Sequence, residues 1–469
     1  MSLDVALNYA VSGLTATQQQ LQVIAGNISN VQTPGYSEET LPQYSSTSTN
    51  GGAGVVTGEI QRETDKGLQT ALLAQSTLSG STAATNNYQQ QIQSLLGQVG
   101  SSNSFSDALN NFQSALQTAA ATPQDAVAQL SAINAGQQLT TQLNSLSSGV
   151  QTLRANADSQ IATDVTTLNT QINTIAQLNG QISRLQSLGQ PTASLEDHRD
   201  QALSQIASLI GVQSYTRPDG TMVVLTSQGQ TLVDAETANT FTYNQSGSVS
   251  AGTTLSPLTL NGTDVTSGTT TGEIGALLTM RDTTLPGLTA QLNQFTNGLF
   301  NQSSDADLGT TNSGLGATND ANNFFANVDT TAGVDNAATI EVNPSLAADP
   351  GLLDSNAGAP DPSITQTLSS NLQATTAFAA AGGVPATTTT LSQYAGQVIG
   401  NAATTAAAAT SNANDQSALL SQMQSQYSSA TGVNLDSELS TLIVYQNAYS
   451  ASARVISTIQ TMYQALMNA

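Results

Sequence analysis

Apolar side chains recur every three or four residues at both ends of this 469-residue chain, which is the spacing of one face of a helix. A period near 3.5 residues gathers them into one stripe that packs against another helix. The pattern predicts helices over residues 3–31 and 435–467, and it predicts that their stripes form an assembly interface. The stripe positions are Leu7, Ala10, Leu14, Thr17, Leu21, Ile24, Ile28, Val31, Leu435, Leu439, Leu442, Tyr449, Ala453, Ile456 and Tyr463.

Helical spacing also dominates the segment that follows the first helix. It extends over residues 67–188, with breaks expected near Gly97, Gly100 and Pro123, and a second helix is expected over 194–210. Asn179 lies on the stripe of the long helix, where a polar group can fix the register. Helical spacing returns over 274–299, 363–381 and 391–429, and Pro286 should kink or divide the first of these.

The middle of the chain changes to the period of β-strands. Side chains alternate between Val212 and Val233, and the segment Arg217-Pro218-Asp219-Gly220 predicts a turn between two strands. Strands are also expected over 240–243 and over 258–265, and a short one is expected at Val55 and Val56. Residues 303–362 are acidic and poorly periodic, with one strand expected over 339–342.

These patterns predict a mainly α, elongated, multi-domain protein with a β-rich insert, whose N- and C-terminal helices pair as a coiled-coil or helical-bundle stalk. The domains are discontinuous. The predicted divisions are 1–66 plus 430–469 for the terminal assembly helices and adjoining extended segment, 67–211 plus 272–302 and 363–429 for a helical bundle, 212–271 for the β-rich insert, and 303–362 for an acidic, irregular excursion in the outer lobe.

The charge of the chain limits its partners. The net charge is −23, and no Lys or Arg occurs between Arg281 and Arg454. Such an acidic surface repels phosphate backbones and anionic lipid, which argues against nucleic-acid or membrane-surface binding. The chain has no cysteine, so thiolate chemistry and disulfides are excluded.

Targeting signals are also missing from the sequence. No basic segment precedes an apolar one at the start, as a cleaved secretory signal requires. No apolar run approaches the ~20 residues of a membrane span. These features fit a cytoplasmic protein, and they fit equally a protein exported without a cleaved signal.

Two groups of residues invite a chemical interpretation. The segment Glu196-Asp197-His198-Arg199-Asp200 holds the only His, which suggests a general base or a metal ligand. One His without Cys makes a poor transition-metal site, so a role at a helix start or in ion pairs is favoured. Asp305, Asp307 and Asp320 suggest calcium, but they lack the spacing of a calcium loop. We therefore predict no catalytic, cofactor or metal site and no enzymatic activity.

Residues 25–36, Ala-Gly-Asn-Ile-Ser-Asn-Val-Gln-Thr-Pro-Gly-Tyr, resemble the N-terminal motif of bacterial flagellar axial proteins, the group of rod, hook and hook-associated proteins. Tyr36 stands where rod and hook proteins have Phe. With Tyr at this position, the motif resembles that of the family of the first hook-associated protein, at the hook–filament junction. Residues 195–201 and 272–282 resemble interior elements of that family, and residues 432–456 resemble its C-terminal motif. Gly26, Ser437 and the pair Glu38-Glu39 depart from the family pattern.

This resemblance implies a structural protein of the bacterial flagellum. It implies export through the flagellar type III apparatus without a cleaved signal, so the protein would be extracellular. It implies a ring of copies in the flagellar axis between the hook protein and the next hook-associated protein towards the filament. It also implies an export chaperone that binds the C-terminal region. Neither nucleic-acid binding nor membrane insertion is implied.

Three other interpretations stay open at this point. The chain could be another flagellar axial protein, of the hook or filament type, which the element at 195–201 argues against. It could be an acidic extracellular hydrolase centred on His198, which predicts loss of an activity in His198→Ala. It could also be a cytoplasmic coiled-coil scaffold, which predicts that the protein does not reach the medium.

Overall fold

The computed structural model describes residues 3–46, 54–97, 104–306, 308–310, 322–329, 334–356 and 359–468. The chain forms two compact units. Unit 1 contains Met1–Ser79, Thr166–Phe241 and Gln416–Ala469, and unit 2 contains Gly80–Val165 and Thr242–Asp415. Three of the four divisions between the units fall inside long helices, α2 (Lys66–Leu96), α4 (Ala126–Ser187) and α11 (Leu391–Thr431), and the fourth falls inside the short strand at 241–242.

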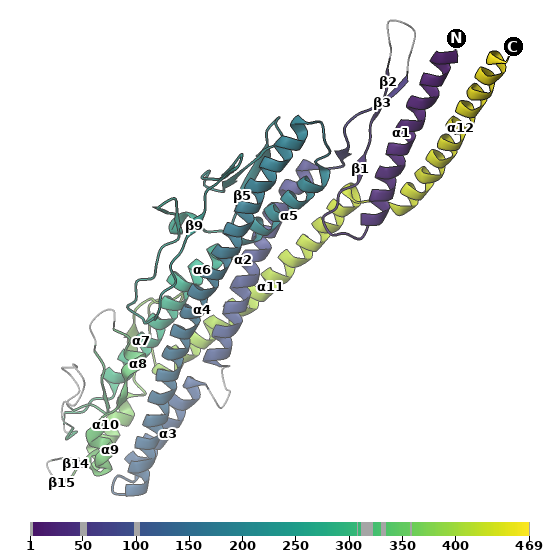
Figure 1. Cartoon of the computed structure of the whole chain (residues 1–469). Helices are drawn as coiled ribbons and strands as arrows, with labels where there is room; N and C mark the ends of the chain where they lie inside the picture. Colours follow the sequence, from purple (N-terminus) through teal and green to yellow (C-terminus); the bar gives the residue numbers. More distant parts are fainter. Residues whose placement is uncertain are drawn as a thin grey trace. The chain divides into compact units, whose positions relative to one another are not determined.

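Unit 1 contains both terminal helices, which lie side by side with the two chain ends at the same end of the pair (Figure 1). It also holds two small antiparallel pairs of strands, β1 with β4 and β2 with β3, which follow the first helix. The elements of this part are α1 (Leu3–Asn30), β1 (Glu39–Thr40), β2 (Gln43–Ser46), β3 (Gly54–Thr57), β4 (Gln61–Arg62), α5 (Ala193–Leu209) and α12 (Leu435–Met467).

A four-stranded antiparallel sheet in the order β5-β6-β7-β8 completes unit 1. Its strands are β5 (Val212–Thr216), β6 (Met222–Thr226), β7 (Thr231–Asp234) and β8 (Thr237–Ala238), and β9 (Phe241–Thr242) follows. Asn179 of α4 holds this sheet, because its amide nitrogen donates to the carbonyls of Met222 and Ala235, both at 2.8 Å. The predicted polar residue on the helical stripe thus fixes a sheet against the helix.

Unit 2 is built around α3 (Phe105–Ala121), whose inward face is fully buried. Ser104 caps the helix by accepting a hydrogen bond from the backbone N–H of Asp107 at 3.2 Å. Phe105 packs edge-to-face on Phe295, with ring centroids 5.3 Å apart. The other elements that start after residue 242 are β10 (Thr259–Leu260), β11 (Thr263–Asp264), the 3₁₀ turn Thr266–Gly268, α6 (Gly272–Thr279), α7 (Leu285–Gln302), β12 (Phe325–Ala326), α8 (Asn336–Thr339), β13 (Glu341–Val342), α9 (Pro344–Ala348), the 3₁₀ turn Pro350–Asp354, β14 (Ser355–Asn356), β15 (Ala359–Pro360), α10 (Ser363–Asn371), β16 (Thr376–Phe378) and β17 (Thr387–Thr389).

A π-helical turn, Met280–Thr284, joins α6 to α7. It places Arg281 in the interior, where the side chain is paired with the buried Asp158 at 3.3 Å and with Asp282 at 2.7 and 2.8 Å. Pro286 follows in the first turn of α7, where its missing N–H costs no hydrogen bond. The π-helical turn interrupts the α-helix just before Pro286, where the sequence predicted a kink or a division.

The predicted fold class, mainly α with a strand-rich insert and paired terminal helices, is confirmed. Two local expectations are wrong. The helix predicted over 363–381 ends at Asn371, and Thr376–Phe378 instead forms a strand that pairs with Thr387–Thr389. The chain can turn between these strands because Gly382 and Gly383 adopt positive φ angles.

The predicted irregular excursion over 303–362 also needs correction in its described parts. They contain short helices and strands, and several of their side chains are buried. Phe324 and Phe325 pack on Phe112 of α3, with ring centroids 5.0 and 5.5 Å away. The acidic composition of this segment gave no sign that two of its aromatic side chains belong to the interior of unit 2. The four-domain division made from the sequence stays a prediction.

Candidate assembly interface

The terminal helices α1 and α12 run antiparallel, as contacts near both ends of the pair show. Asn27 of α1 donates to Glu438 Oε1 of α12 at 3.0 Å. At the other end, the hydroxyl of Tyr463 donates to Asp4. Midway, a Cβ on Gly13 would lie 3.9 Å from Ser452 Oγ, so the two backbones approach closely there.

Asn27 is the most completely bonded side chain of this pair, and it is 1% exposed. Its amide donates to the Glu39 carbonyl at 2.9 Å as well as to Glu438, and its oxygen accepts from the Tyr36 hydroxyl at 2.9 Å and from the Glu39 N–H at 3.0 Å. All four hydrogen bonds that an Asn side chain can make are therefore used. One residue thus joins α1, α12 and the segment that follows α1.

Acidic groups crowd this joint. Burial, and then the charge of Glu39, raises the pKa of Tyr36. Burial, followed by the charge of Glu438, raises the pKa of Glu38. The second oxygen of Glu438, Oε2, is buried and has no hydrogen-bond partner among the described residues. Burial and the charge of Glu438 therefore both favour the protonated form of Glu38 at this joint.

The predicted stripe of α1 lies largely inside unit 1. Thr17 and Ile24 are buried, and Leu7, Ala10, Leu14, Leu21, Ile28 and Val31 are half-buried.

The predicted stripe of α12 behaves differently along its length. Leu442, Ile456 and Tyr463 are half-buried, whereas Leu435, Leu439, Tyr449 and Ala453 are exposed. A 3.5-residue period drifts by about 20° per heptad on a straight helix. Over the four heptads from Leu435 to Tyr463 the stripe therefore turns by about 80°, from solvent towards α1.

Two exposed apolar lines flank the side of α12 that meets α1. The heptad spacing in the sequence identified one line, which contains Leu435 and Leu439. It did not identify the second line, because the residues of that line are spaced by eleven, seven and four positions and do not continue the heptad. It also missed the buried Glu438 and Ile459. Counted at about 100° per residue, the two lines lie on opposite sides of the α1 contact. The missed line consists of Val444, Val455, Met462 and Leu466, which are 48–69% exposed.

The charge-dense segment of α5 forms an ion-pair cluster around Arg62 of β4, which we call the Arg62 cluster. The guanidinium lies 3.1 Å from Glu196, 2.6 Å from Asp197 and 3.0 Å from Asp200. Burial alone would lower the pKa of Arg62, but the three carboxylates outweigh it and raise this pKa. The expected ion-pair role of the segment is confirmed, and Arg62 is the partner that sequence reasoning did not find.

His198 is exposed and takes no part in the ion pairs of this cluster. Asp197, its neighbour, instead accepts from the backbone N–H of Ser37 and pairs with Arg62. No carboxylate is shown orienting the imidazole, as a general base would require.

The described residues contain neither a cluster of metal ligands nor a helix that could span a membrane. In these parts of the chain, no group of three or more His, Cys, Asp or Glu is arranged to hold a metal ion. Asp307 and Asp320, two of the calcium candidates, lie outside the described residues. The described helices also include none that is long and apolar enough to span a membrane.

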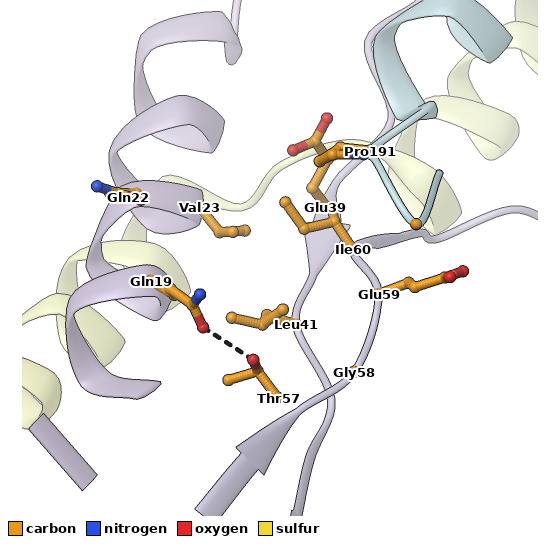
Figure 2. A pocket seen from close by; sticks show the side chains of 11 residues that line it. Gln19, Gln22, Val23, Glu39, Leu41, Thr57, Gly58, Glu59, Ile60 and Pro191 are labelled. Atoms are coloured by element: carbon orange, nitrogen blue, oxygen red, sulfur yellow. Dashed lines mark hydrogen bonds between the residues drawn. The ribbon is translucent and has the colours of Figure 1, made fainter. Parts of the chain in front are cut away.

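A hollow of about 630 Å³ lies against α1 in unit 1, and we call it the α1 pocket (Figure 2). Its apolar wall comes from Val23, Leu41, Ile60 and Pro191, and Glu39 and Glu59 are its acidic members. Gln19 on its α1 side accepts a hydrogen bond from the Thr57 hydroxyl at 2.8 Å.

Three models of flagellar protein families match parts of the chain. Residues 89–325 match the family model of the flagellar hook-associated protein FlgK helical domain. Residues 7–36 match that of the flagella basal body rod protein, and residues 424–469 match that of the flagellar basal body rod FlgEFG protein C-terminal region.

Individual relatives carry the same description. The flagellar hook-associated protein 1 of Salmonella typhimurium is 31% identical over 293 residues, which covers 59% of this chain and 51% of the relative. That of Escherichia coli is 29% identical over 290 residues, covering 59% and 52%. The chain thus spans about half the length of these curated relatives. The solved flagellar hook junction protein FlgK from Burkholderia pseudomallei is 27% identical, covering 55% of this chain and 46% of that one, with a TM-score of 0.45.

Proposed function

The chain belongs to the family of the flagellar hook-associated protein FlgK, and from this premise we propose that it polymerises at the junction between hook and filament. It acts as a structural adaptor there and has no enzymatic role. Copies form a ring in the flagellar axis by packing their α1 and α12 helices against those of neighbours.

The observation that carries this proposal is the surface of α12. The helix pair leaves apolar side chains in solvent on both sides of the α1 contact, with Leu439 on one side and Val444 and Leu466 on the other, which are 47%, 61% and 69% exposed. Exposed apolar lines of this kind mark a surface that a partner covers. A helix with one such line on each side is suited to a layer in which every copy has two neighbours.

The distribution of charge supports the same role. The whole chain carries a net charge of −23, so copies of it should repel one another. The two assembly helices escape this repulsion, because their only charged residues are Asp4, Asp436, Glu438 and Arg454. Helices so poor in charge can pack closely with their own copies.

We further propose that the pair gains much of its order in the polymer. Many side chains that α1 turns towards its neighbours are only half-buried, and the apolar lines of α12 stay in water. Helices that bury little apolar surface are marginal on their own. Circular dichroism of a chain that lacks residues 1–35 and 430–469 tests this, because removing the ends should leave the main cooperative transition in place.

The remaining partners follow from the family. The hook protein would lie on one side of the ring and the next hook-associated protein on the other. The chain would leave the cell through the flagellar type III apparatus, with an export chaperone bound to its C-terminal region. Secretion that stops when flagellar export is disabled is the expected result.

The test uses a cell whose own copy of the gene is deleted. Electron microscopy should show hooks without filaments, and the wild-type chain should restore the filaments. Met462→Asp and Val444→Asp should fail to restore them, since each would bury a charge between helices. Asn447→Asp, at an exposed position about 180° around the helix from Glu438 and on neither apolar line, is the matched control and should restore them. Full-length filaments on cells that lack the chain would refute the junction role, and loss of the hooks themselves would indicate a different axial component.

A further inference from the structure

The assembly helices carry one cation, Arg454, and its position on α12 is unusual. It lies sixteen residues after Glu438, which bonds to Asn27 of α1, and this spacing places it about 160° around the helix. Arg454 is exposed, and in the part of the chain that the structure describes no carboxylate lies within ion-pair distance of it. The guanidinium therefore points away from α1 and is available to another molecule.

The α1 pocket has the complementary character. Val23, Leu41 and Ile60 converge on the hollow, while Glu59 extends from its rim (Figure 2). Glu39 lines the same hollow and is half-buried, and burial followed by the charge of Asp197 raises its pKa. An apolar wall beside two carboxylates suits a long side chain with an apolar stem and a charged end.

Arginine fits this site better than lysine does. Its planar guanidinium presents several N–H donors at once, so it can engage two carboxylates that lie apart. Its hydration is weaker than that of an ammonium group, which lowers the cost of leaving water. Gln19 on the α1 side of the pocket adds an amide oxygen that can accept a hydrogen bond from the same end.

We propose that Arg454 of a second copy of this chain enters the α1 pocket of its neighbour, with its stem on Val23, Leu41 and Ile60 and its guanidinium between Glu39 and Glu59. A second copy is the occupant because the charges are complementary and because α1 itself forms one wall of the pocket, which makes the pocket continuous with the assembly helices. Different surfaces of the two copies meet, so the contact propagates into a ring or a helical polymer. The inference rests on the proposed function and names the contact that sets the register between copies.

Cross-linking tests the contact directly, because the chain contains no cysteine of its own. Two differently tagged chains, one with Glu59→Cys and one with Arg454→Cys, are expressed together in the deletion strain, and isolated flagella are treated with a short thiol-to-thiol cross-linker. A product that carries both tags is expected. Glu63→Cys, from the exposed acid four residues further on, replaces Glu59→Cys in the matched control and should give no such product.

Charge exchange is the second test. Arg454→Glu or Glu59→Arg alone should lower the number of attached filaments roughly tenfold, the effect of losing about 1.4 kcal/mol per contact. The double variant, which restores opposite charges, should recover attachment. Asp436→Arg and Glu63→Arg are the matched controls for charge change and should keep it.

The outcomes separate this inference from the proposed function. If Arg454→Glu and Glu59→Arg attach filaments normally and no cross-link forms, while Met462→Asp fails, the contact is wrong and the junction role stands. If Met462→Asp also attaches filaments normally, both are wrong. Circular dichroism of each purified variant guards against misfolding, and because Arg454 and Glu59 are exposed, wild-type spectra are expected.

Discussion

Replacing Asp164 by Asn is expected to stabilise unit 2, and more so in alkaline than in acidic solution. Asp164 is 5% exposed and lies on α4. Its Oδ1 accepts from Gln160 at 2.8 Å, but its Oδ2 is buried without a hydrogen-bond partner among the described residues. The charge of Glu273 raises the pKa of Asp164, and the charge of Asp164 raises the pKa of Tyr88. In the part of the chain that the structure describes, no cation is paired with Asp164 or Glu273.

The pKa of Asp164 gives the magnitude. Burial, and then Glu273, raises it from 3.8 to about 7, whereas Gln160 opposes the shift. A raised pKa means that the folded state binds the proton more tightly than the unfolded state does. The stability that this proton provides is complete below pH 3.8 and is lost as the pH rises through about 7. At ~1.4 kcal/mol per pKa unit, the titration of Asp164 lowers the free energy of unfolding by about 2 kcal/mol at pH 5.5 and by as much as ~4 kcal/mol at pH 8, relative to its value in strong acid.

The assay is urea unfolding of the full chain by circular dichroism at pH 5.5 and pH 8. Asp164→Asn should raise the free energy of unfolding at both, and by ~2 kcal/mol more at pH 8. Asp415→Asn, at an exposed position of α11, is the control and should change it by less than about 0.5 kcal/mol. A variant that is less stable than the wild type at pH 8, or equally shifted at both values, would show that Asp164 is better solvated than its geometry indicates.

Three further substitutions test the interior. Arg62→Met should destabilise unit 1 by about 3 kcal/mol, since it leaves three carboxylates without their cation, and the loss should shrink in acid when measured by thermal melting. Phe112→Ala should cost unit 2 about 3–5 kcal/mol in urea unfolding by removing the contacts with Phe324 and Phe325, whereas an unchanged midpoint would contradict that packing. Gly35→Ala should cost about 1 kcal/mol or more, because Gly35 has a φ of +77° and a Cβ there would lie 2.7 Å from Gln201 Nε2; a crystal structure of the variant should show that side chain displaced.

The helices were predictable because their signals are local. The breaks near Gly97 and Pro123 and the end of α5 before Gly211 follow from residues within one turn of each boundary. The sheet β5-β6-β7-β8 was predictable because apolar and polar side chains alternate along its strands and because a turn falls at Gly220, whose φ is +79°. Periodicity and turn chemistry thus fixed most element boundaries to within a few residues.

The contacts of the site were not predictable in the same way, because they join distant parts of the chain. Arg62 meets carboxylates more than 130 positions away, and nothing in its neighbours marks it as their partner. Asn27 belongs to a recognisable motif, yet its bond to Glu438 spans 411 positions. The missed apolar line on α12 has a further cause, since a search for heptads rejects a straight helix with several apolar sides.

The 411 positions between Asn27 and Glu438 also set the timing of events during translation. A ribosome adds about 5–20 residues per second, so the first helix waits roughly 20–80 seconds before its mate emerges. Throughout that interval the nascent polypeptide lacks the completed helical hairpin. The contact between α1 and α12 can therefore form only after nearly the whole chain has been made.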